Sequence, residues 1–377
     1  MKGGLFKMKF NCSKNSLDSA ISIVQKAVKT NTTVPILEGI LIQAEDSKVK
    51  LTGYDLETGI EADVNSDVIS EGSVVINSKI FGEIIRKLPD ENVTITTDDR
   101  FGLSIESGST VFNIRGNSSE GYPKIPVIGN NNKIILPQAM LKKMISKTIF
   151  AVSKDDSRQS LTGCYLESNG RDITMVAIDG FRMALRKTYA GEEFPQMNYI
   201  IPGKALNEAA KIFDDKTEDE EVIIYSSDNH LLFDIGHVRI VSRLIKGPFV
   251  AYNSIIKKNP MSVMTINKKA LLDAVERAAL IILTDERRCP VQFYMNESGT
   301  VLTVTANTDC GTLREDVEAS LTGEKIDIDF NARYLIDALK NIDDETIKIE
   351  FNGGQGPCII TQNEGDEFVY LILPIRR

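Results

Sequence analysis

The residues best suited to acid–base or metal chemistry in this sequence are three aspartates and two histidines. Asp55, Asp179 and Asp309 stand in the segments LTGYDLE, MVAIDGF and TANTD, 124 and 130 residues apart. An aspartate that recurs at equivalent places in repeated segments is more often a turn or capping residue than a catalytic acid. His230 and His237 lie in one strand-like run and are too few for a histidine-rich metal site. We therefore expect no metal site.

The cysteines and the common catalytic motifs also give no reaction chemistry. Five cysteines, an odd number, lie far apart and form no CxxC pair, which favours a reducing cytosol over disulfides or zinc. The sequence has no P-loop, dinucleotide-binding, GxSxG or HExxH motif. We predict no catalytic residue and no cofactor. A metal-dependent nuclease or hydrolase of α+β type stays open as an alternative, as does a protein scaffold that does not bind DNA.

The elements that would position functional residues repeat three times along the chain. A strand followed by an amphipathic helix occurs at 9–28, at 134–150 and at 264–281, with the helix-opening leucines Leu17, Leu141 and Leu271 124 and 130 residues apart. A second strand–helix pair, marked by Phe81, Leu206 and Leu335, has spacings of 125 and 129. Sequence repeats of this kind indicate tandem copies of one structural unit.

The repeat predicts an α+β protein of three similar domains, each with two helices packed on antiparallel sheets. We expect the domains at 8–130, 131–258 and 259–377, after a short extension at 1–7. The segments 116–133 and 246–260, rich in Gly, Asn and Pro, are the predicted junctions. No run of 18 apolar residues occurs, so the sequence predicts no transmembrane helix.

The charges are distributed unevenly between helices and the rest of the chain. The sequence has 44 Lys and Arg against 53 Asp and Glu, a net charge of −9. Basic residues nevertheless outnumber acidic ones by 15 to 6 in the six predicted helices, at 16–29, 78–88, 137–147, 203–213, 267–280 and 332–341. Lysine is a good helix former on a solvated face, which accounts for any single helix. Six net-positive helices in an acidic chain favour a polyanionic partner.

The third helix window illustrates the expected contact with that partner. Leu141, Met144 and Ile145 would face the sheet, whereas Lys142, Lys143 and Lys147 would face outward. Helix lysines contact phosphates without reading the base sequence. The sequence lacks Trp and any helix-turn-helix, zinc-finger or RNA-recognition signature. We therefore expect salt-sensitive contact with the backbone of double-stranded DNA.

Several segments together resemble the bacterial sliding clamps, the beta subunits of DNA polymerase III. They are MKF, TVPILEGILIQA followed by LTGYDLE, VAIDGFRMA and the ending LILPIRR, and the resemblance runs from Met8 to Arg377. It implies a head-to-tail homodimer whose six domains close a ring round duplex DNA, with the helices lining the hole. It also implies a non-catalytic, cytoplasmic processivity factor that tethers the replicative polymerase, the clamp loader and repair enzymes through short peptide motifs.

The resemblance also implies sites. The family's DNA-facing positions fall on Lys79, Arg86, Lys87, Lys204 and, in the loop 154–160, Arg158. This sequence departs from the family at Asn31, where an arginine can occur and Lys29 is the nearby substitute, and at Gln159–Ser160, where aromatic residues occur. The family's dimer contacts fall on Phe112 and Ile114 in the first domain and on Leu280 and Ile281 in the third.

A peptide-binding pocket between the second and third domains is the remaining site that the resemblance implies. Its wall departs from the family at Val250, where a proline is common, and at Ser254, where an arginine can occur. Mostly apolar side chains with a few polar anchors suit a short amphipathic peptide. The implied positions are Leu161, Ile178, Gly180, Phe181, Arg182, Met183, Val250, Ile255, Asn331, Tyr334, Pro357, Leu373, Pro374, Ile375 and Arg376.

Overall fold

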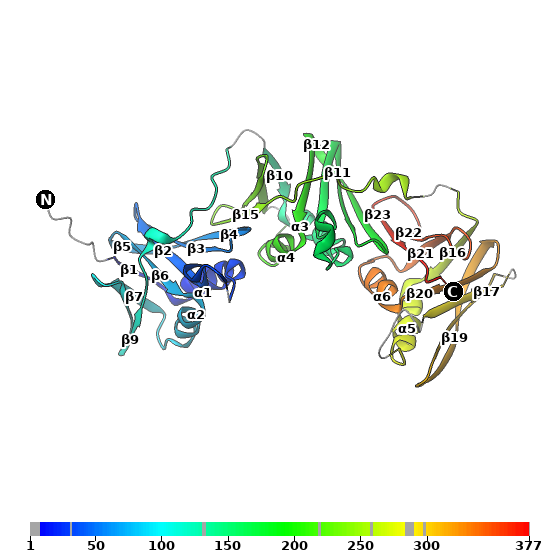
Figure 1. Ribbon diagram of the computed structural model, residues 1–377, viewed down its shortest axis with the longest axis horizontal. Coiled ribbons are helices and arrows are strands. Elements are labelled where there is room, and N and C mark those ends of the chain that lie inside the picture. Colours follow the sequence, from blue (N-terminus) through cyan, green and yellow to red (C-terminus); the bar gives the residue numbers. More distant parts are fainter. Residues whose placement is uncertain are drawn as a thin grey trace. The chain divides into compact units, whose positions relative to one another are not determined.

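The computed structural model describes residues 8–30, 32–129, 133–217, 220–256, 259–282, 290–296 and 299–376 (Figure 1). The expected extension at 1–7 and the position Asn31 lie outside these residues. The chain forms two compact units. The first takes the chain to Ala139 and adds Lys211–Leu244, and the second comprises Met140–Ala210 and the chain from Ile245 onward. The central third of the sequence therefore contributes strands to both units.

Two antiparallel sheets build the first unit. The smaller has the strand order β5-β1-β7-β8-β9, and the larger has the order β10-β13-β14-β15-β4-β3-β2-β6. The strands are β1 (Lys9–Ser13), β2 (Gly39–Glu45), β3 (Lys48–Tyr54), β4 (Thr58–Val64), β5 (Ser66–Ser70), β6 (Gly72–Asn77), β7 (Asn92–Thr97), β8 (Gly102–Ser107), β9 (Thr110–Arg115), β10 (Lys133–Pro137), β13 (Glu221–Ser226), β14 (His230–Asp234) and β15 (Val238–Arg243).

One ten-stranded antiparallel sheet forms the second unit, in the order β11-β12-β23-β22-β21-β16-β19-β18-β17-β20. Its strands are β11 (Gly163–Ile178), β12 (Arg182–Pro202), β16 (Ser262–Asn267), β17 (Val291–Met295), β18 (Val301–Thr308), β19 (Gly311–Gly323), β20 (Ile326–Phe330), β21 (Thr346–Phe351), β22 (Cys358–Gln362) and β23 (Phe368–Ile372).

Each predicted strand–helix pair is present, which confirms the threefold repeat. The helices are α1 (Lys14–Val24), α2 (Ser78–Lys87), α3 (Gln138–Ser146), α4 (Gly203–Ala210), α5 (Lys268–Ala279) and α6 (Ala332–Lys340). Asparagine side chains begin three of them, because Asn77, Asn267 and Asn331 accept hydrogen bonds from backbone N–H groups of the first turn. The windows 16–29 and 203–213 were too long, since α1 ends at Val24 and α4 at Ala210.

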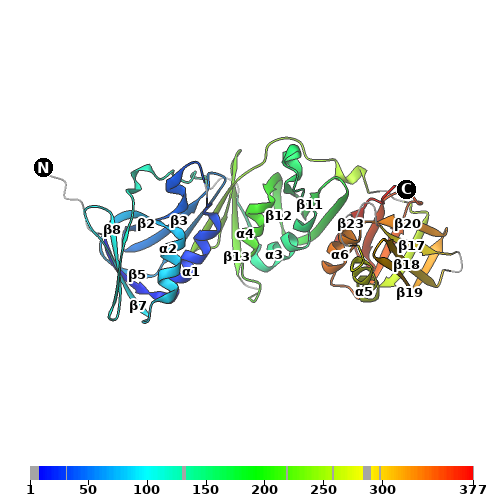
Figure 2. The same cartoon turned by 60° about the horizontal axis from the view of Figure 1, so that its bottom comes forward.

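The helices bury one apolar stripe each and leave their basic side chains on the other faces. In the first unit, α1 and α2 lie side by side, with α1 packed on β3 and β4 (Figure 2). Leu17, Ile21 and Val24 of α1 are buried at helical spacing. In the second unit, α5 and α6 form the same kind of pair (Figure 2). Within the described residues, no helix is long and apolar enough to cross a membrane.

The repeats are joined by strand pairing of one kind. In the first unit, β15 pairs with β4, and Ile240 lies opposite Ile60. In the second unit, β23 pairs with β12, and Tyr370 lies opposite Ala184. In both cases the last strand of one repeat pairs with the strand that begins just after Asp55 or Asp179 in the repeat before it. We call these two places the first and second junctions.

A linker covers the first junction. The Tyr122 hydroxyl donates a hydrogen bond to the carbonyl of Thr52 at 3.2 Å, and Ile128 packs with Leu232 and Val241. Ile125 lies against Gly59, so close that a Cβ added at Gly59 would stand 2.6 Å from the Ile125 Cδ1 atom. The Ile125 side chain of the linker therefore fills the space above Gly59.

Candidate partner-binding groove and basic helices

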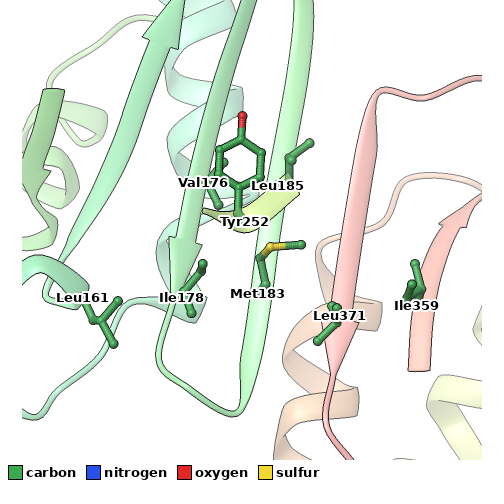
Figure 3. Packing of buried hydrophobic residues seen from close by; sticks show 8 residues of the cluster. All are labelled: Leu161, Val176, Ile178, Met183, Leu185, Tyr252, Ile359 and Leu371. Atoms are coloured by element: carbon green, nitrogen blue, oxygen red, sulfur yellow. The ribbon is translucent and has the colours of Figure 1, made fainter. Parts of the chain in front are cut away.

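An apolar cluster surrounds the turn between β11 and β12. Leu161, Ile178 and Met183, three of the predicted pocket positions, are buried together there (Figure 3). Ile255, a fourth, is half-buried and packs against them. The structure brings these apolar residues together at the second junction, because β12 pairs there with β23. These side chains lie beneath the predicted peptide-binding surface, which we call the groove.

A tight turn shapes one wall of the groove. The Asp179 Oδ1 atom accepts hydrogen bonds from the backbone N–H groups of Phe181, at 2.9 Å, and Arg182, at 3.0 Å. Gly180 between them has φ of +95°, a left-handed conformation that a side chain would strain. The turn presents Phe181 outward, with half of its side chain exposed. Asp179 is thus a turn residue, as the sequence predicted.

Helix α6 and the end of the chain form the other walls. Tyr334 stacks on Phe181 with ring centroids 6.4 Å apart. The Leu373 N–H donates to the Phe181 carbonyl, and the Ile375 N–H donates to the Asp329 carbonyl, both at 2.8 Å. The strand β23 ends at Ile372, before Pro374, which cannot donate to a ladder. The tail is therefore anchored on two sides of the groove.

Other predicted pocket residues have local roles or lie at the rim. Asn331 caps α6 through its Oδ1 atom, and the Pro357 carbonyl accepts a hydrogen bond from the Asn352 side chain. Val250 and Arg376 are exposed. Val250, at which the sequence departs from the family, does not belong to the buried cluster.

Sequence reasoning missed five residues of the same cluster, namely Val176, Leu185, Tyr252, Ile359 and Leu371 (Figure 3). The available signal was in the final strand, where Leu371 and Tyr370 must point to opposite faces, so that Leu371 could have been assigned to this cluster. The Tyr252 hydroxyl hydrogen-bonds the Glu167 carboxylate. Burial and the Glu167 carboxylate raise the pKa of Tyr252 above its usual value. Tyr252 therefore stays protonated and able to donate at neutral pH.

Asp55 is a turn residue, as predicted, whereas Asp309 does not lie at the equivalent place in the third repeat. Asp55 Oδ1 accepts from the backbone N–H of Thr58 at 2.7 Å, as Asp179 does for Arg182. In the third repeat the pairing of Asn307 with Thr312 places Thr308, not Asp309, at the equivalent position. Thr308 Oγ1 accepts from the Cys310 N–H at 3.2 Å. A threonine hydroxyl can form the same kind of turn. The alignment of Asp309 with Asp55 and Asp179 was therefore wrong by one residue.

Histidine, cysteine and carboxylate side chains form no metal-binding group of three among the described residues. The predicted DNA-facing side chains Lys79, Arg86, Lys87, Arg158 and Lys204 are exposed. Lys29 is engaged locally, since its Nζ atom lies 3.4 Å from an Asp55 carboxylate oxygen and 3.6 Å from one of Glu57.

One helix lysine does not lie as predicted. The Lys147 side chain is only 14% exposed, because its Nζ atom lies 2.6 Å from the Asp343 carboxylate. Lys143 also pairs with Asp343, at 3.5 Å, and Lys142 is half-buried. The prediction that Lys147 faces outward is therefore wrong, because an acidic side chain 196 residues away draws it in.

The predicted dimer contacts lie at surface positions. Phe112 and Ile114 are half-buried on β9, which ends the five-stranded sheet. Leu280 follows α5 and is 73% exposed. Ile281 is half-buried. Leu280 is thus a large apolar side chain with little cover from its own chain, which is typical of a contact surface.

Three family models match consecutive parts of the chain. They describe the N-terminal, central and C-terminal domains of the DNA polymerase III beta subunit and match residues 8–126, 135–250 and 253–376. A curated relative, the beta sliding clamp of Halalkalibacterium halodurans, is 35% identical over 98% of this chain and 100% of its own length.

Solved structures are similar over the same extent. A beta subunit from Eubacterium rectale superposes with a TM-score of 0.94 at 35% identity and covers 98% of this chain and 100% of its own. The DNA polymerase sliding clamp of Bacillus subtilis has a TM-score of 0.93 at 33% identity and covers 98% of this chain and 99% of its own. The likeness extends over all three repeats.

Proposed function

The chain belongs to the DNA polymerase III beta subunit family, the bacterial sliding clamps, and its function is that of a DNA polymerase processivity factor. From that premise we propose how it performs this function. Two copies join head to tail into a closed ring round duplex DNA. The basic helices face the DNA, and the groove binds short peptide segments of the replicative polymerase, the clamp loader and repair enzymes. The protein acts in the cytoplasm and catalyses no reaction.

The strand pairing of the junctions is the single observation that carries the proposal. Strand β4 of the first repeat pairs with β15, and β12 of the second repeat pairs with β23. The strand of the third repeat that corresponds to β4 and β12 is the amino-terminal half of β19, which pairs on one side with β18. Among the described strands, none pairs with the other side of this half of β19, because β16 pairs only with the carboxy-terminal half. None pairs with the outer side of β9 either. A second copy placing β9 on β19 would complete both edges.

The junctions also predict the register of that contact. Phe112 corresponds to Ile240 and Tyr370, which lie opposite Ile60 and Ala184. The residue of β19 that corresponds to these last two is Leu313. We therefore expect Phe112 opposite Leu313 of the second copy, and Asn113 opposite its Thr312. The contact is heterologous, and two such contacts close a ring.

Sizing and a topological assay test the ring. The native protein should have twice the chain mass of 41.7 kDa at micromolar concentration. Loaded on closed circular DNA it should stay bound in high salt and be released when the circle is cut, because a ring slides off a free end. A monomeric mass at micromolar concentration, or equal retention on cut and closed DNA, would contradict the proposal.

Deletion of the tail tests the groove independently. Removing Leu373–Arg377 takes away the wall that hydrogen-bonds to Phe181 and Asp329. The truncated protein should stay dimeric, because the proposed dimer contacts lie on other elements, and its affinity for a fluorescent polymerase-derived peptide should fall. Full peptide affinity after truncation would place the binding site elsewhere.

A further inference from the structure

The Arg182 guanidinium is held by acceptors from three segments of the chain. Its Nε atom donates to an Asp179 carboxylate oxygen at 2.9 Å, and its Nη1 atom to one of Asp337 at 2.6 Å. Its Nη2 atom donates to the Phe150 carbonyl at 2.7 Å. The side chain is only 10% exposed. Each guanidinium nitrogen therefore has an acceptor within the chain, although the family resemblance implies that Arg182 contacts the peptide.

The same guanidinium supports the aromatic wall of the groove. Its Cζ atom lies 4.5 Å from the centre of the Tyr334 ring, within the range of a cation–π contact. Phe181 stacks on Tyr334. The Phe181 carbonyl in turn accepts the hydrogen bond of the Leu373 N–H. The positions of Phe181, which is exposed, and Tyr334, which is half-buried, therefore depend on where the guanidinium is held.

We propose that Asp337 is a positioning residue for peptide binding, which acts through Arg182 without touching the peptide. Asp337 comes from α6, whereas Arg182 begins β12, so their ion pair fixes the helix that carries Tyr334 against the turn that carries Phe181. Asp179 stabilises the same guanidinium but belongs to the turn itself and cannot fix the helix. Nothing in the sequence pattern marked Asp337, which lies 155 residues from its partner.

The inference rests on the proposed function of the groove and gives a defined expectation. Asp337→Asn removes the charge while keeping the size of the side chain. Phe181 and Tyr334 would then have to be ordered when the peptide binds, and ordering two side chains weakens binding roughly tenfold. Asp337→Glu, which keeps the charge, should restore most of the affinity.

The matched control is Asp343→Asn. Asp343 follows α6 and forms ion pairs with Lys147 and Lys143, outside the groove. Its replacement removes a comparable ion pair, so peptide affinity should stay at the wild-type value if the effect of Asp337 is specific. Affinity is measured by fluorescence anisotropy with a polymerase-derived peptide on the full-length protein, and circular dichroism monitors the fold.

A double-mutant cycle separates positioning from a general structural effect. If Asp337 acts through Arg182, then Asp337→Asn should add little to the weakening already caused by Arg182→Lys. Additive effects would overturn the proposal, as would wild-type affinity in Asp337→Asn. Ile178→Asp, beneath the groove, tests the proposed function separately. If Ile178→Asp still binds the peptide, the groove is not the site; if it abolishes binding while Asp337→Asn does not change it, only the positioning role fails.

Discussion

Phe150 and Tyr370 pack edge to face, with ring centroids 5.4 Å apart and planes at 86°. They belong to neighbouring repeats and close the helix side of the second junction. By the repeat, Phe150 corresponds to Leu280 and Tyr370 to Phe112. In the proposed dimer, Leu280 of one chain would therefore pack on Phe112 of the other. This apolar pair would take the place that Phe150 and Tyr370 occupy at the second junction.

The first prediction concerns that apolar pair. Leu280→Asp should leave the monomer folded, because the side chain is exposed, and should weaken the dimer by on the order of 3 kcal/mol per interface by burying a carboxylate without a partner. Sedimentation equilibrium measures the dimer constant. Val127→Asp is the control, since Val127 is 98% exposed and lies on neither of the elements proposed to meet. An unchanged dimer constant in Leu280→Asp would refute the apolar pair.

The second prediction tests the register. Asn113→Cys with Thr312→Cys, in a Cys310→Ser background, should form a disulfide between chains under mild oxidation, because cross-strand neighbours lie within bonding distance. A non-reducing gel should show the dimer band. Asn113→Cys with Asp316→Cys is displaced along the strand by four residues and should not cross-link. Efficient cross-linking of the displaced pair alone would mean another register.

The third prediction concerns the helix charges. Arg86→Glu with Lys87→Glu, both exposed on α2, should weaken DNA binding and lower the slope of log affinity against log salt by roughly two, one for each phosphate that the helix no longer neutralises. An equal charge change at the exposed Lys48 and Lys133, outside the helices, is the control. If both pairs lower the slope equally, the helices have no special role.

The fourth prediction concerns pH. Burial raises the pKa of the Asp343 carboxyl, but the hydrogen bond and charge of Lys147, with the charge of Lys143, outweigh it and leave the pKa below its ordinary 3.8. A lowered folded-state pKa gives stability that is present above the ordinary value and is lost as pH falls through the folded one. Urea unfolding should therefore show Asp343→Asn to be less stable than wild type at pH 7, by under about 1 kcal/mol for this exposed carboxylate. The difference should vanish near pH 2, and persistence there would contradict the ion-pair origin.

The fifth prediction uses the thiols. Cys310 is exposed, whereas Cys12, Cys164 and Cys358 are buried. Burial raises the pKa of Cys12 and Cys164 to about 12, so almost no thiolate forms at pH 8. Among these four cysteines, iodoacetamide should label Cys310 first, as mass spectrometry of the peptides would show. Labelling of Cys310 should slow when the protein is concentrated enough to dimerise, because Cys310 lies two residues before Thr312, which is proposed to pair with Asn113 of the second copy. Rapid labelling of Cys164 in the folded protein would contradict its burial.

The repeat and its helices were predictable because each strand–helix pair carries a local signal, a strand followed by an apolar stripe at helical spacing, and α1, α2, α5 and α6 also begin with an asparagine or serine cap. The pairing of distant side chains was not. Lys147 reads as a solvated helix lysine until Asp343 is placed beside it. Arg182 matches a family pocket position, but its partner Asp337 lies in another repeat. Local patterns contain no information about pairs of that sequence separation.

In the proposed ring, the linker above Gly59 would limit how many partners bind at a time. Gly59 occupies in the first repeat the place that Met183 occupies in the groove, since each follows its turn at the same register. At the first junction Ile125 of the same chain lies over that place. A partner peptide could bind there only by displacing Ile125, which is part of the same chain and therefore always present. In the proposed dimer, each chain thus offers one peptide-binding surface rather than two, so a ring of two chains would bind at most two such partners at a time.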